Sequence, residues 1–273
     1  MTSPDAGSLL REWRQRRHVS QLDLASRAGV STRHVSFVET GRARPTSQMI
    51  LRLCDHLGVP LREQNRVLLA GGYAPAHPEH ALADPPMAEV SAAIEAILTA
   101  HLPFPALVVD VGWDLVSAND AVYAMLDGVA PRLLEPPVNV IRLTLDPEGI
   151  APRIVNLDEW RDHLLRRLHR EYDASADPRL ADLLVELDGP PDGPGHRPSD
   201  RPGPPSTPNG PNSDIPGLVV PLRLRAGGGT GGPTFSFLST TTVFGTPREV
   251  TLSELAIEAF YPADQQTRDL IVR

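Results

Sequence analysis

The sequence predicts a two-domain protein in which an all-α domain of five helices is followed by an α+β domain. Residues 1–72 have apolar side chains at helical spacing and hold 11 Arg against 6 acidic residues, a balance of 11 − 6 = +5. Residues 73–86 have no such periodicity and contain several prolines, which is typical of a linker. Residues 87–273 mix helical and strand-like patterns. Residues 73–273 together hold 15 Arg against 28 acidic residues, a balance of 15 − 28 = −13.

Length and composition narrow the class of protein. The chain has 273 residues, enough for two domains that each bury a core, and 41% of them are hydrophobic. The only cysteine, Cys54, excludes a disulfide framework and a Cys-based zinc finger, and we interpret it as a core thiol. The sequence has no apolar run of about 18 residues and no basic-then-apolar N-terminus. We therefore expect no membrane span, no secretion signal and a cytoplasmic location.

The segment SQLDLASRAGVSTRHVSFVETGRAR, residues 20–44, has the pattern of a helix-turn-helix. Ser20 and Asp23 form a capping-box pattern, in which each side chain can satisfy a free backbone N–H at the start of a helix. This helix is expected to end at Gly29, because glycine adopts the positive φ of a tight turn without steric cost.

Ser31 is a good N-cap for a second helix that runs up to Gly41. At 100° per residue Val35 and Val38 share the face that packs inward. The opposite face is polar and contains an arginine, as a recognition helix in the major groove requires. Its members are Thr32, Arg33, Ser36 and Thr40.

Three side chains near this helix are predicted to support DNA binding. Gln21 is placed to reach a phosphate or to buttress the base contacts. Arg42 and Arg44 follow the helix and suit phosphate oxygens better than base edges. Helix-turn-helix geometry also occurs in proteins that bind no DNA, so a solvated basic face is the alternative interpretation.

Three more helices complete the predicted first domain. The first helix has an apolar edge formed by Leu9, Leu10 and Trp13. Ser47 is expected to cap the fourth helix, and Pro60 to open the fifth, which ends at Gly71.

The blocks SQLDLASRAGVS, HVSFVETGRARPT and MILRLCDHLGVP together resemble the lambda-repressor-like XRE family of bacterial regulators over roughly residues 7–72. The resemblance implies sequence-specific binding to double-stranded DNA. It also implies an ion pair between Glu39 and a basic residue of the first helix, here Arg14.

The α+β domain is expected to begin with a helix over 87–100. The segment PALVVDVGWDLVSAND then places strands over 106–110 and 113–117 on either side of a glycine-containing turn, with a helix over 118–126. Strand, turn, strand and helix is how a PAS-like sheet begins, although other α+β domains begin in the same way.

Two helices and three strands are expected in the rest of this domain. The helices are predicted over 157–172 and 178–187, and strands in GLVVPLRLRA, in PTFSFLSTTTVFG and over 250–260, before a closing helix. Residues 189–216 contain 10 Pro and 5 Gly among 28 residues. Such a segment buries too little apolar surface to offset its ordering entropy, so we expect a disordered insertion there.

The segments PALVVDVGWDLVSAND, DEWRDHLLRRL and LSELAIEAFYPAD resemble the MmyB-like ligand-binding domain, a PAS-like module fused behind XRE domains. The resemblance spans roughly 87–188 and 215–272, and it implies a small hydrophobic ligand such as a fatty acid. The Pro/Gly-rich insertion departs from the family pattern.

Five side chains are candidates for the wall of a ligand pocket: Trp113, Asn119, Trp160, Phe235 and Phe237. Aromatic side chains also dominate ordinary cores, so each aromatic candidate has a purely structural alternative. Asn119 either orients a ligand head group or caps the helix that follows it.

Other classes of protein fit the sequence less well. All 26 basic residues are Arg, which excludes a Walker-A lysine and a Schiff base, and no G-x-S-x-G or H-E-x-x-H motif occurs. His77 and His80 lie in a proline-broken stretch without a third ligand nearby, so we predict no metal site. An antitoxin-like protein whose acidic second domain grips another polypeptide is the main alternative.

The sequence therefore predicts a cytoplasmic, non-enzymatic transcription regulator that needs no cofactor beyond its ligand. It would bind a two-fold-related operator as a homodimer, because one recognition helix offers too few base contacts for genomic specificity. Ligand binding would change the spacing or stability of the dimer.

Overall fold

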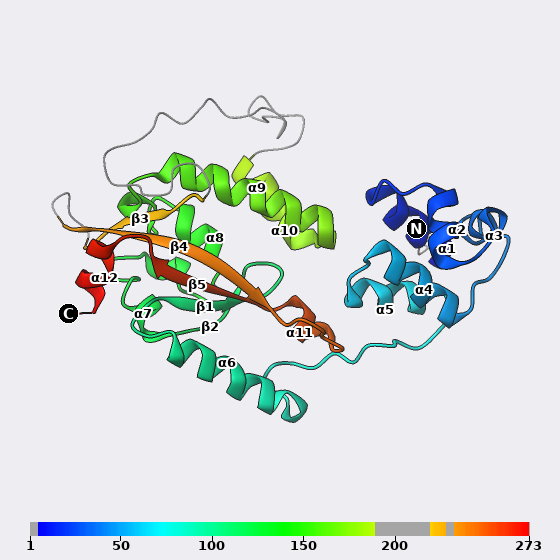
Figure 1. Ribbon diagram of the computed structural model, residues 1–273, viewed down its shortest axis with the longest axis horizontal. Coiled ribbons are helices and arrows are strands. Elements are labelled where there is room, and N and C mark those ends of the chain that lie inside the picture. The colour runs from blue at the N-terminus through cyan, green and yellow to red at the C-terminus, as the bar shows by residue number, and fades with distance from the viewer. Residues whose placement is uncertain (1–4, 189–218, 228–231, 273) are drawn as a thin grey trace. The chain divides into compact units, whose positions relative to one another are not determined.

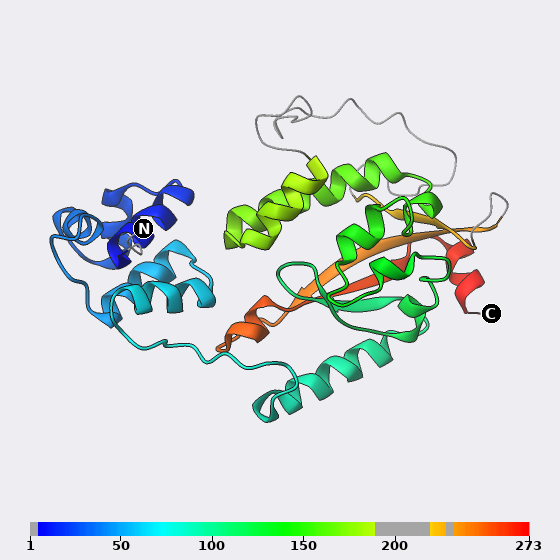
Figure 2. The same ribbon diagram turned by 180° about the vertical axis from the view of Figure 1, so that it is seen from behind.

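The computed structural model describes residues 5–188, 219–227 and 232–272. Its contacts divide the chain into two compact units (Figures 1 and 2). The first unit comprises Met1–Met87 with Phe244–Ser253, and the second comprises Ala88–Val243 with Glu254–Arg273. The predicted insertion at 189–216 lies outside the described residues.

All five helices expected in the first unit are present. They are α1 (Ala6–Arg16), α2 (Gln21–Ala28), α3 (Thr32–Glu39), α4 (Ser47–Leu57) and α5 (Leu61–Ala70). Their apolar edges meet in one core, whose most buried large side chains are Leu10, Leu24, Ile50, Leu53 and Leu68. Cys54 belongs to this core, and burial with the nearby Asp55 raises the pKa of its thiol to about 12, so the thiol is inert at neutral pH.

The caps of the helix-turn-helix follow the sequence closely. Ser20 Oγ accepts a hydrogen bond from the Asp23 N–H at 3.1 Å and donates to the Asp23 carboxylate at 2.6 Å. Gly29 has a φ of 66°, which ends α2. The prediction that Ser47 caps α4 was wrong. Thr46 has the extended backbone of a cap and accepts from the Met49 N–H at 3.2 Å, while Ser47 is already the first helical residue.

A glycine sets the contact between α1 and α3. A Cβ atom at Gly7 would collide with the carbonyl oxygen of Val38. Only glycine allows the two backbones to approach this closely, and the contact fixes the start of α1 against the end of the recognition helix.

The expected linker has no helix or strand between 73 and 84, yet it is attached to the helical core. Asn65 Oδ1 accepts hydrogen bonds from the backbone N–H groups of Ala76 and His77 at 2.9 and 3.0 Å, and Asn65 Nδ2 donates to the His77 carbonyl at 2.8 Å. The Oε1 atom of Gln64 lies 3.0 Å from Nε2 of the His77 ring. The chain leaves the helical domain along a defined path.

A segment from far along the chain, residues 249–251, forms hydrogen bonds with Pro78 and His80. The carbonyl of Pro78 accepts from the Val250 N–H at 2.9 Å, and the Thr251 hydroxyl donates to the His80 carbonyl at 2.7 Å. Glu249 Oε1 accepts from the His80 N–H at 2.7 Å. Residues 244–253 therefore belong to the first unit although they separate two strands of the second.

The second unit is built on one antiparallel sheet of five strands in the order β2-β1-β5-β4-β3. The strands are β1 (Ala106–Val109), β2 (Leu115–Ala118), β3 (Leu222–Arg225), β4 (Thr234–Val243) and β5 (Ala256–Pro262). β5, which comes last in the chain, lies at the centre of the sheet and pairs Val108 with Ile257 and Thr240 with Ala259. The sheet is therefore complete only when its last strand, β5, has paired with its first strand, β1.

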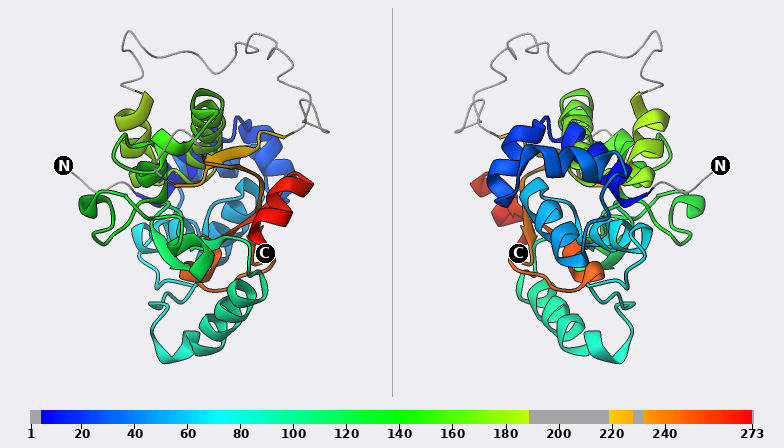
Figure 3. Two further views of the ribbon diagram at one scale, coloured as in Figure 1. Left: turned by 90° about the vertical axis from the view of Figure 1, so that its left-hand side faces the viewer. Right: turned by 90° about the vertical axis from the view of Figure 1, so that its right-hand side faces the viewer.

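Six helices accompany the sheet in the described residues: α6 (Ala88–Ala100), α7 (Asp120–Tyr123), α8 (Val140–Leu145), α9 (Leu157–Ser175), α10 (Pro178–Asp188) and α12 (Gln265–Ile271). Another helix, α11 (Val250–Glu254), lies almost wholly within the segment that belongs to the first unit. Short 3-10 turns lie at Pro85–Met87, Pro131–Leu133 and Ala151–Arg153. α8, α9 and α10 lie over one face of the sheet, and α12 lies beside β4 (Figures 1 and 3). The core between helices and sheet includes Trp160, Leu168, Leu180, Leu224 and Phe237.

Three predicted elements beyond residue 87 were wrong in part. The strand expected over 113–117 is β2, which begins only at Leu115 because Trp113 lies in a turn. The helix expected over 118–126 is shorter, covering only Asp120–Tyr123. The strand expected over 250–260 begins only at Ala256, because residues 250–254 form α11. The Glu249 carboxylate accepts from the Leu252 N–H at 2.6 Å, and this cap selects a helical turn over the extended form that Val and Thr favour.

Candidate functional site

The face predicted to contact DNA lies on α3 of the first unit. Ser31 Oγ accepts from the His34 N–H at 3.1 Å and starts the helix, and Val35 and Val38 bury its inner face. The outer face is accessible: Arg33 and Thr40 are exposed, and Thr32 and Ser36 are half-buried. The Arg33 guanidinium lies 5.0 Å from the centre of the Phe37 ring, which holds the long side chain along the helix surface.

An ion pair locks α3 to α1. Arg14 Nε and Nη2 donate to the two carboxylate oxygens of Glu39 at 2.6 and 2.9 Å, and Arg14 Nη1 donates to the Val19 carbonyl at 2.9 Å. The Glu39 side chain is only 2% exposed. The pair expected between these helices is therefore present and buried.

Gln21 completes the environment of this carboxylate. Its Nε2 donates to Glu39 Oε2 at 2.8 Å, so Gln21 buttresses the recognition helix from α2. Burial alone would raise the pKa of Glu39, but hydrogen bonds from Arg14 and Gln21 and the charges of Arg14 and Arg11 outweigh it and lower that pKa. The hydrogen bond from Arg14 to Glu39 raises the Arg14 pKa. Both groups stay charged at neutral pH.

The two arginines after α3 differ in their surroundings. Arg42 is exposed. Arg44 Nη2 donates to the Gly71 carbonyl at 3.0 Å, and its guanidinium lies 5.7 Å from the centre of the Tyr73 ring. The Tyr73 hydroxyl in turn donates to the Pro45 carbonyl at 2.9 Å. Arg44 therefore ties the loop after α3 to the end of α5, a structural role that its sequence position did not indicate.

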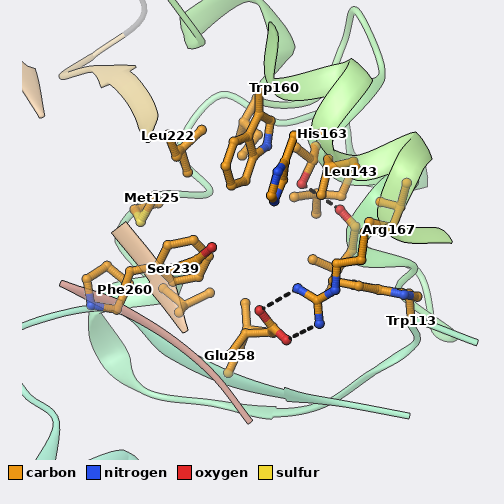
Figure 4. A pocket seen from close by; sticks show the side chains of 18 of the residues that line it. Trp113, Met125, Leu143, Trp160, His163, Arg167, Leu222, Ser239, Glu258 and Phe260 are labelled. Atoms are coloured by element: carbon orange, nitrogen blue, oxygen red, sulfur yellow. Dashed lines mark hydrogen bonds and ion pairs between the residues drawn. The ribbon is translucent and has the colours of Figure 1, made fainter. Parts of the chain in front are cut away.

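The second unit contains a cavity of about 80 Å³ between the sheet and the helices above it (Figure 4). Apolar side chains from β1, α7, α8, α9, β3 and β5 line most of it, among them Leu107, Val122, Leu143, Leu164, Leu222 and Phe260. Five lining residues carry polar or charged side-chain atoms outside the indoles: Thr144, His163, Arg167, Ser239 and Glu258. The cavity is thus an apolar chamber with a few polar groups, which is the usual character of a small-molecule site.

Trp113 lines the cavity from a strained turn. Asp110 Oδ1 accepts from the N–H groups of Gly112 and Asp114, both at 2.9 Å, and Trp113 has a φ of 66°, unusual for a bulky residue. The indole Nε1 donates to Glu171 Oε2 at 2.7 Å. A packed turn that holds an aromatic side chain in a disfavoured conformation at a cavity wall is typical of a binding site.

A buried ion pair forms part of the cavity wall beside this tryptophan. Arg167 of α9 donates to the two carboxylate oxygens of Glu258 of β5 at 3.0 and 2.6 Å, and its Nε donates to Glu171 at 2.7 Å. The Arg167 guanidinium lies 4.4 Å from the centre of the Trp113 ring. Burial alone would lower the Arg167 pKa, but the bonds and charges of the two glutamates outweigh it and raise that pKa.

Of the five residues predicted to line a pocket, two line this cavity and three do not. Trp113 and Trp160 line it, whereas Asn119, Phe235 and Phe237 do not. Phe237 is buried behind Phe260, with the two ring centres 6.3 Å apart, and Phe235 stacks on Phe237 at 6.1 Å. Both phenylalanines share the face of β4 that carries Ser239, a lining residue, but they lie nearer the start of the strand and pack in the core beside the cavity.

Asn119 does not line the cavity, and its side chain bonds to the backbone of other elements. Its Oδ1 accepts from the Ala106 N–H at 3.1 Å, and its Nδ2 donates to the carbonyls of Leu98 and Phe104 at 3.1 and 2.8 Å. It makes no side-chain cap for α7. The amide instead fastens the end of α6 to the start of β1.

The charged and polar residues of the cavity wall were not among the residues predicted from the sequence. His163 and Arg167 follow Trp160 by three and seven residues and so share its face of α9, a spacing that could have identified them. Glu258 stands between the buried residues Ile257 and Ala259 in a strand, where a glutamate is unusual. Ser239 offers no comparable sequence signal.

Within residues 5–188, 219–227 and 232–272, no group of three or more His, Cys, Asp or Glu side chains could hold a metal ion. Across those same ranges, no helix combines the length and the apolar character needed to cross a membrane.

Comparison with known proteins gives two matches to families. Residues 5–67 match a family described as a helix-turn-helix domain, and residues 90–200 match one described as the MmyB-like transcription regulator ligand binding domain. No curated protein matches the chain.

One solved structure is similar over much of the chain. It is described as an RNA-binding light-oxygen-voltage receptor, is 14% identical, and aligns with 97% of this chain and 62% of its own length at a TM-score of 0.26. The chain thus spans about 62% of the length of that receptor. At this TM-score the likeness supports no conclusion about fold or function.

Proposed function

Since this chain is an XRE-type helix-turn-helix transcription regulator with an MmyB-like ligand-binding domain, we propose that it binds a two-fold-related operator as a homodimer and that a small hydrophobic molecule in its cavity alters this binding. Its architecture is that of a ligand-responsive regulator and not of an enzyme. We further propose that it acts in the cytoplasm, as a helical domain of residues 1–72 joined to a PAS-like domain of residues 87–273.

The charge distribution and α3 support the DNA half of this proposal. The balance of +5 over residues 1–72 attracts phosphate, whereas the balance of −13 over the remainder repels it. α3 exposes Arg33 and Thr40 while the Arg14–Glu39 pair fixes its orientation. A rigid helix with an exposed arginine suits base contacts in the major groove. Gln21, Thr32, Ser36 and Arg42 would support them, and Arg44 would act by holding the loop.

The cavity carries the ligand half of the proposal. Its volume of about 80 Å³ exceeds the roughly 10–15 Å³ that one water needs, and its wall is mostly apolar. It is smaller than the roughly 150 Å³ cavity known to hold benzene. A compact hydrophobic molecule fits this size best, and a long fatty acid would bind only if the wall opened.

The chain offers a direct path from the cavity to the DNA-binding domain. Glu258 on the cavity wall belongs to β5, and the segment just before β5 holds Pro78 and His80 through Glu249, Val250 and Thr251. We propose that a ligand that displaces β5 also displaces this segment, and so changes the spacing of the two DNA-binding domains. The shift can be no larger than the ligand's preference between the two states.

One experiment tests both halves with the full-length protein. An operator is selected from random duplexes, and native mass spectrometry of the purified complex reports the number of chains and any retained small molecule. We expect two chains per operator, and a change in Kd of roughly 5- to 150-fold when the retained molecule is removed, the usual range of allosteric coupling. One chain per operator would contradict the dimer, and a retained second polypeptide in place of a small molecule would favour the partner-binding alternative.

A pair of matched variants tests the cavity itself. Ile150 lines it, so Ile150→Phe should fill the space and abolish the ligand response while operator binding persists. Val155 is 45% exposed, so Val155→Phe adds the same bulk without touching the cavity and should leave the response unchanged. Equal responses in the two variants would place the ligand elsewhere.

A further inference from the structure

The polar groups around the cavity define what chemistry its ligand can carry. This inference rests on the proposed function, because it assumes that the cavity is a ligand site. The cationic side chain on its wall is Arg167, and the anionic one is Glu258. Figure 4 shows their ion pair on one side of the chamber and the rings of Trp160 and His163 together on another.

The charge of Arg167 is already matched. Two hydrogen bonds join it to Glu258, whose side chain is 4% exposed, and a third joins it to Glu171. Two carboxylates therefore surround one guanidinium. A ligand carboxylate would add a third negative charge, or would have to separate Arg167 from Glu258 and strand that glutamate in an apolar chamber.

His163 does not supply a second cation. Its ring stacks on the Trp160 indole with the ring centres 5.2 Å apart. Burial, together with the positive charges of Arg166, Arg167 and Arg170, lowers the His163 pKa below its ordinary value. The imidazole is therefore neutral at pH 7, and the cavity has no unmatched positive charge on its wall.

One hydrogen-bond donor of a lining residue has no acceptor in the part of the chain that the structure describes. The Trp160 side chain is 4% exposed, and its Nε1 is buried without a hydrogen-bond partner among the described residues. An indole N–H can only donate, and buried donors are normally satisfied. The indole of Trp113, by contrast, already donates to Glu171. The cavity thus presents an unsatisfied donor and a balanced ion pair.

We propose that this cavity selects a compact, uncharged molecule with one hydrogen-bond acceptor, such as the carbonyl of a ketone, ester or amide, and that Trp160 Nε1 donates to that acceptor. The apolar wall contacts the hydrocarbon part of the molecule. The Arg167–Glu258 pair stays intact and excludes the carboxylate form of a fatty acid.

Three probes of equal chain length test this proposal on the full-length protein at pH 7.5: 2-hexanone, hexanoate and hexane. Calorimetric titration should rank 2-hexanone first, with a Kd at least tenfold lower than that of hexanoate. In Trp160→Phe, which keeps an aromatic ring but removes the donor, the advantage of 2-hexanone over hexane should shrink by about tenfold. Trp13→Phe removes an indole from the core of the first unit and should leave the ranking unchanged.

A second variant tests the exclusion of charge. Glu258→Gln removes one negative charge with little change of shape, so the Kd of hexanoate should fall at least tenfold while that of 2-hexanone changes little. Tighter binding of hexanoate than of 2-hexanone by the wild type would overturn the inference and leave the proposed sensor intact. If none of the three probes binds while the operator still does, the proposed ligand site fails together with the inference.

Discussion

Two arginine–glutamate pairs, one in each unit, have almost the same geometry but different surroundings. Arg14 binds Glu39 through hydrogen bonds of 2.6 and 2.9 Å, and Arg167 binds Glu258 through bonds of 2.6 and 3.0 Å. In both pairs the glutamate side chain is almost completely buried, at 2% and 4% exposed. The geometry of an ion pair therefore does not distinguish their roles.

The surroundings make the difference. Glu39 accepts a third hydrogen bond, from Gln21, and lies between packed helices, so the first pair serves to hold α3 in place. The second pair borders a cavity, where its atoms can meet a bound molecule. The same interaction fixes a rigid scaffold in one unit and, in the other, borders the cavity that we propose as the ligand site.

The largest expected effect comes from breaking the first pair. Glu39→Ala leaves the Arg14 guanidinium buried without its carboxylate, so the free energy of unfolding should fall by about 3–5 kcal/mol. Chemical denaturation of the full-length protein, followed through the transition of the helical domain, measures this. The control is Glu63→Ala, which removes a partner of Arg66 in an exposed pair and should cost under about 1 kcal/mol. Equal losses in the two variants would mean that the Arg14–Glu39 pair is solvated.

Acid should weaken the same pair. The pKa of Glu39 is lower in the folded protein than its ordinary value, so its contribution to stability is complete above that ordinary value and is lost as the pH falls through the lowered one. The difference in unfolding free energy between the wild type and Glu39→Gln should therefore narrow on acidification. A difference that widens at low pH would show that the Glu39 pKa is raised instead.

Breaking the second pair should cost less. Glu258→Ala leaves Arg167 with Glu171 as a remaining partner, and the adjoining cavity can admit water, so we expect a loss of about 1–3 kcal/mol. Glu186→Ala, which opens the exposed pair with Arg142, is the matched control and should cost under about 1 kcal/mol. A loss as large as that of Glu39→Ala would remove the contrast between the two pairs.

Variants of α3 test whether the helix that the Arg14–Glu39 pair holds in place contacts DNA. Arg33→Ala should reduce discrimination at one base pair by roughly 1–3 kcal/mol, whereas Arg42→Ala should weaken binding to all sequences and lower the salt slope by about 1. Fluorescence anisotropy with the operator and a scrambled duplex, at several salt concentrations, separates the two effects. If Arg33→Ala binds both duplexes as the wild type does, α3 presents a different face to DNA.

The first unit was largely predictable because its signals are local. Ser20, Gly29 and Ser31 fix the ends of α2 and α3 through bonds to residues no more than five positions away. The Arg14–Glu39 pair, 25 residues apart in the chain, came from the family resemblance and not from spacing. In the second unit Arg167 and Glu258 are 91 residues apart, and no local pattern connects them.

Nonlocal contacts also explain the wrong predictions. Residues 250–254 contain Val, Thr and Leu, which favour a strand, but the cap from Glu249 and the bond from Val250 to Pro78 hold them as α11. Asn119 has a sequence position that suits a cap, yet it bonds to three backbone groups between Leu98 and Ala106. The partners of Asn119 lie on other elements of the fold, and one of the two contacts that hold residues 250–254, the bond to Pro78, comes from far along the chain.

The smallest change in stability, but the most direct test of communication between the units, is expected at Glu249. Its carboxylate accepts from the His80 and Leu252 N–H groups, so it joins the chain beyond the helical domain to the segment that leads into β5. Glu249→Gln keeps one acceptor oxygen and should lower the free energy of unfolding by only about 1 kcal/mol.

The operator affinity of Glu249→Gln without ligand should stay within about twofold of the wild-type value. The change in operator affinity on adding ligand should fall several-fold, because β5 would move without carrying residues 78–80. Anisotropy titrations with and without 2-hexanone measure both quantities, and Glu148→Gln, at a surface position 67% exposed, is the control. A full response in Glu249→Gln would show that the cavity and the DNA-binding domain communicate by another route, and a loss of operator binding without ligand would show that this segment instead supports the DNA-bound form directly.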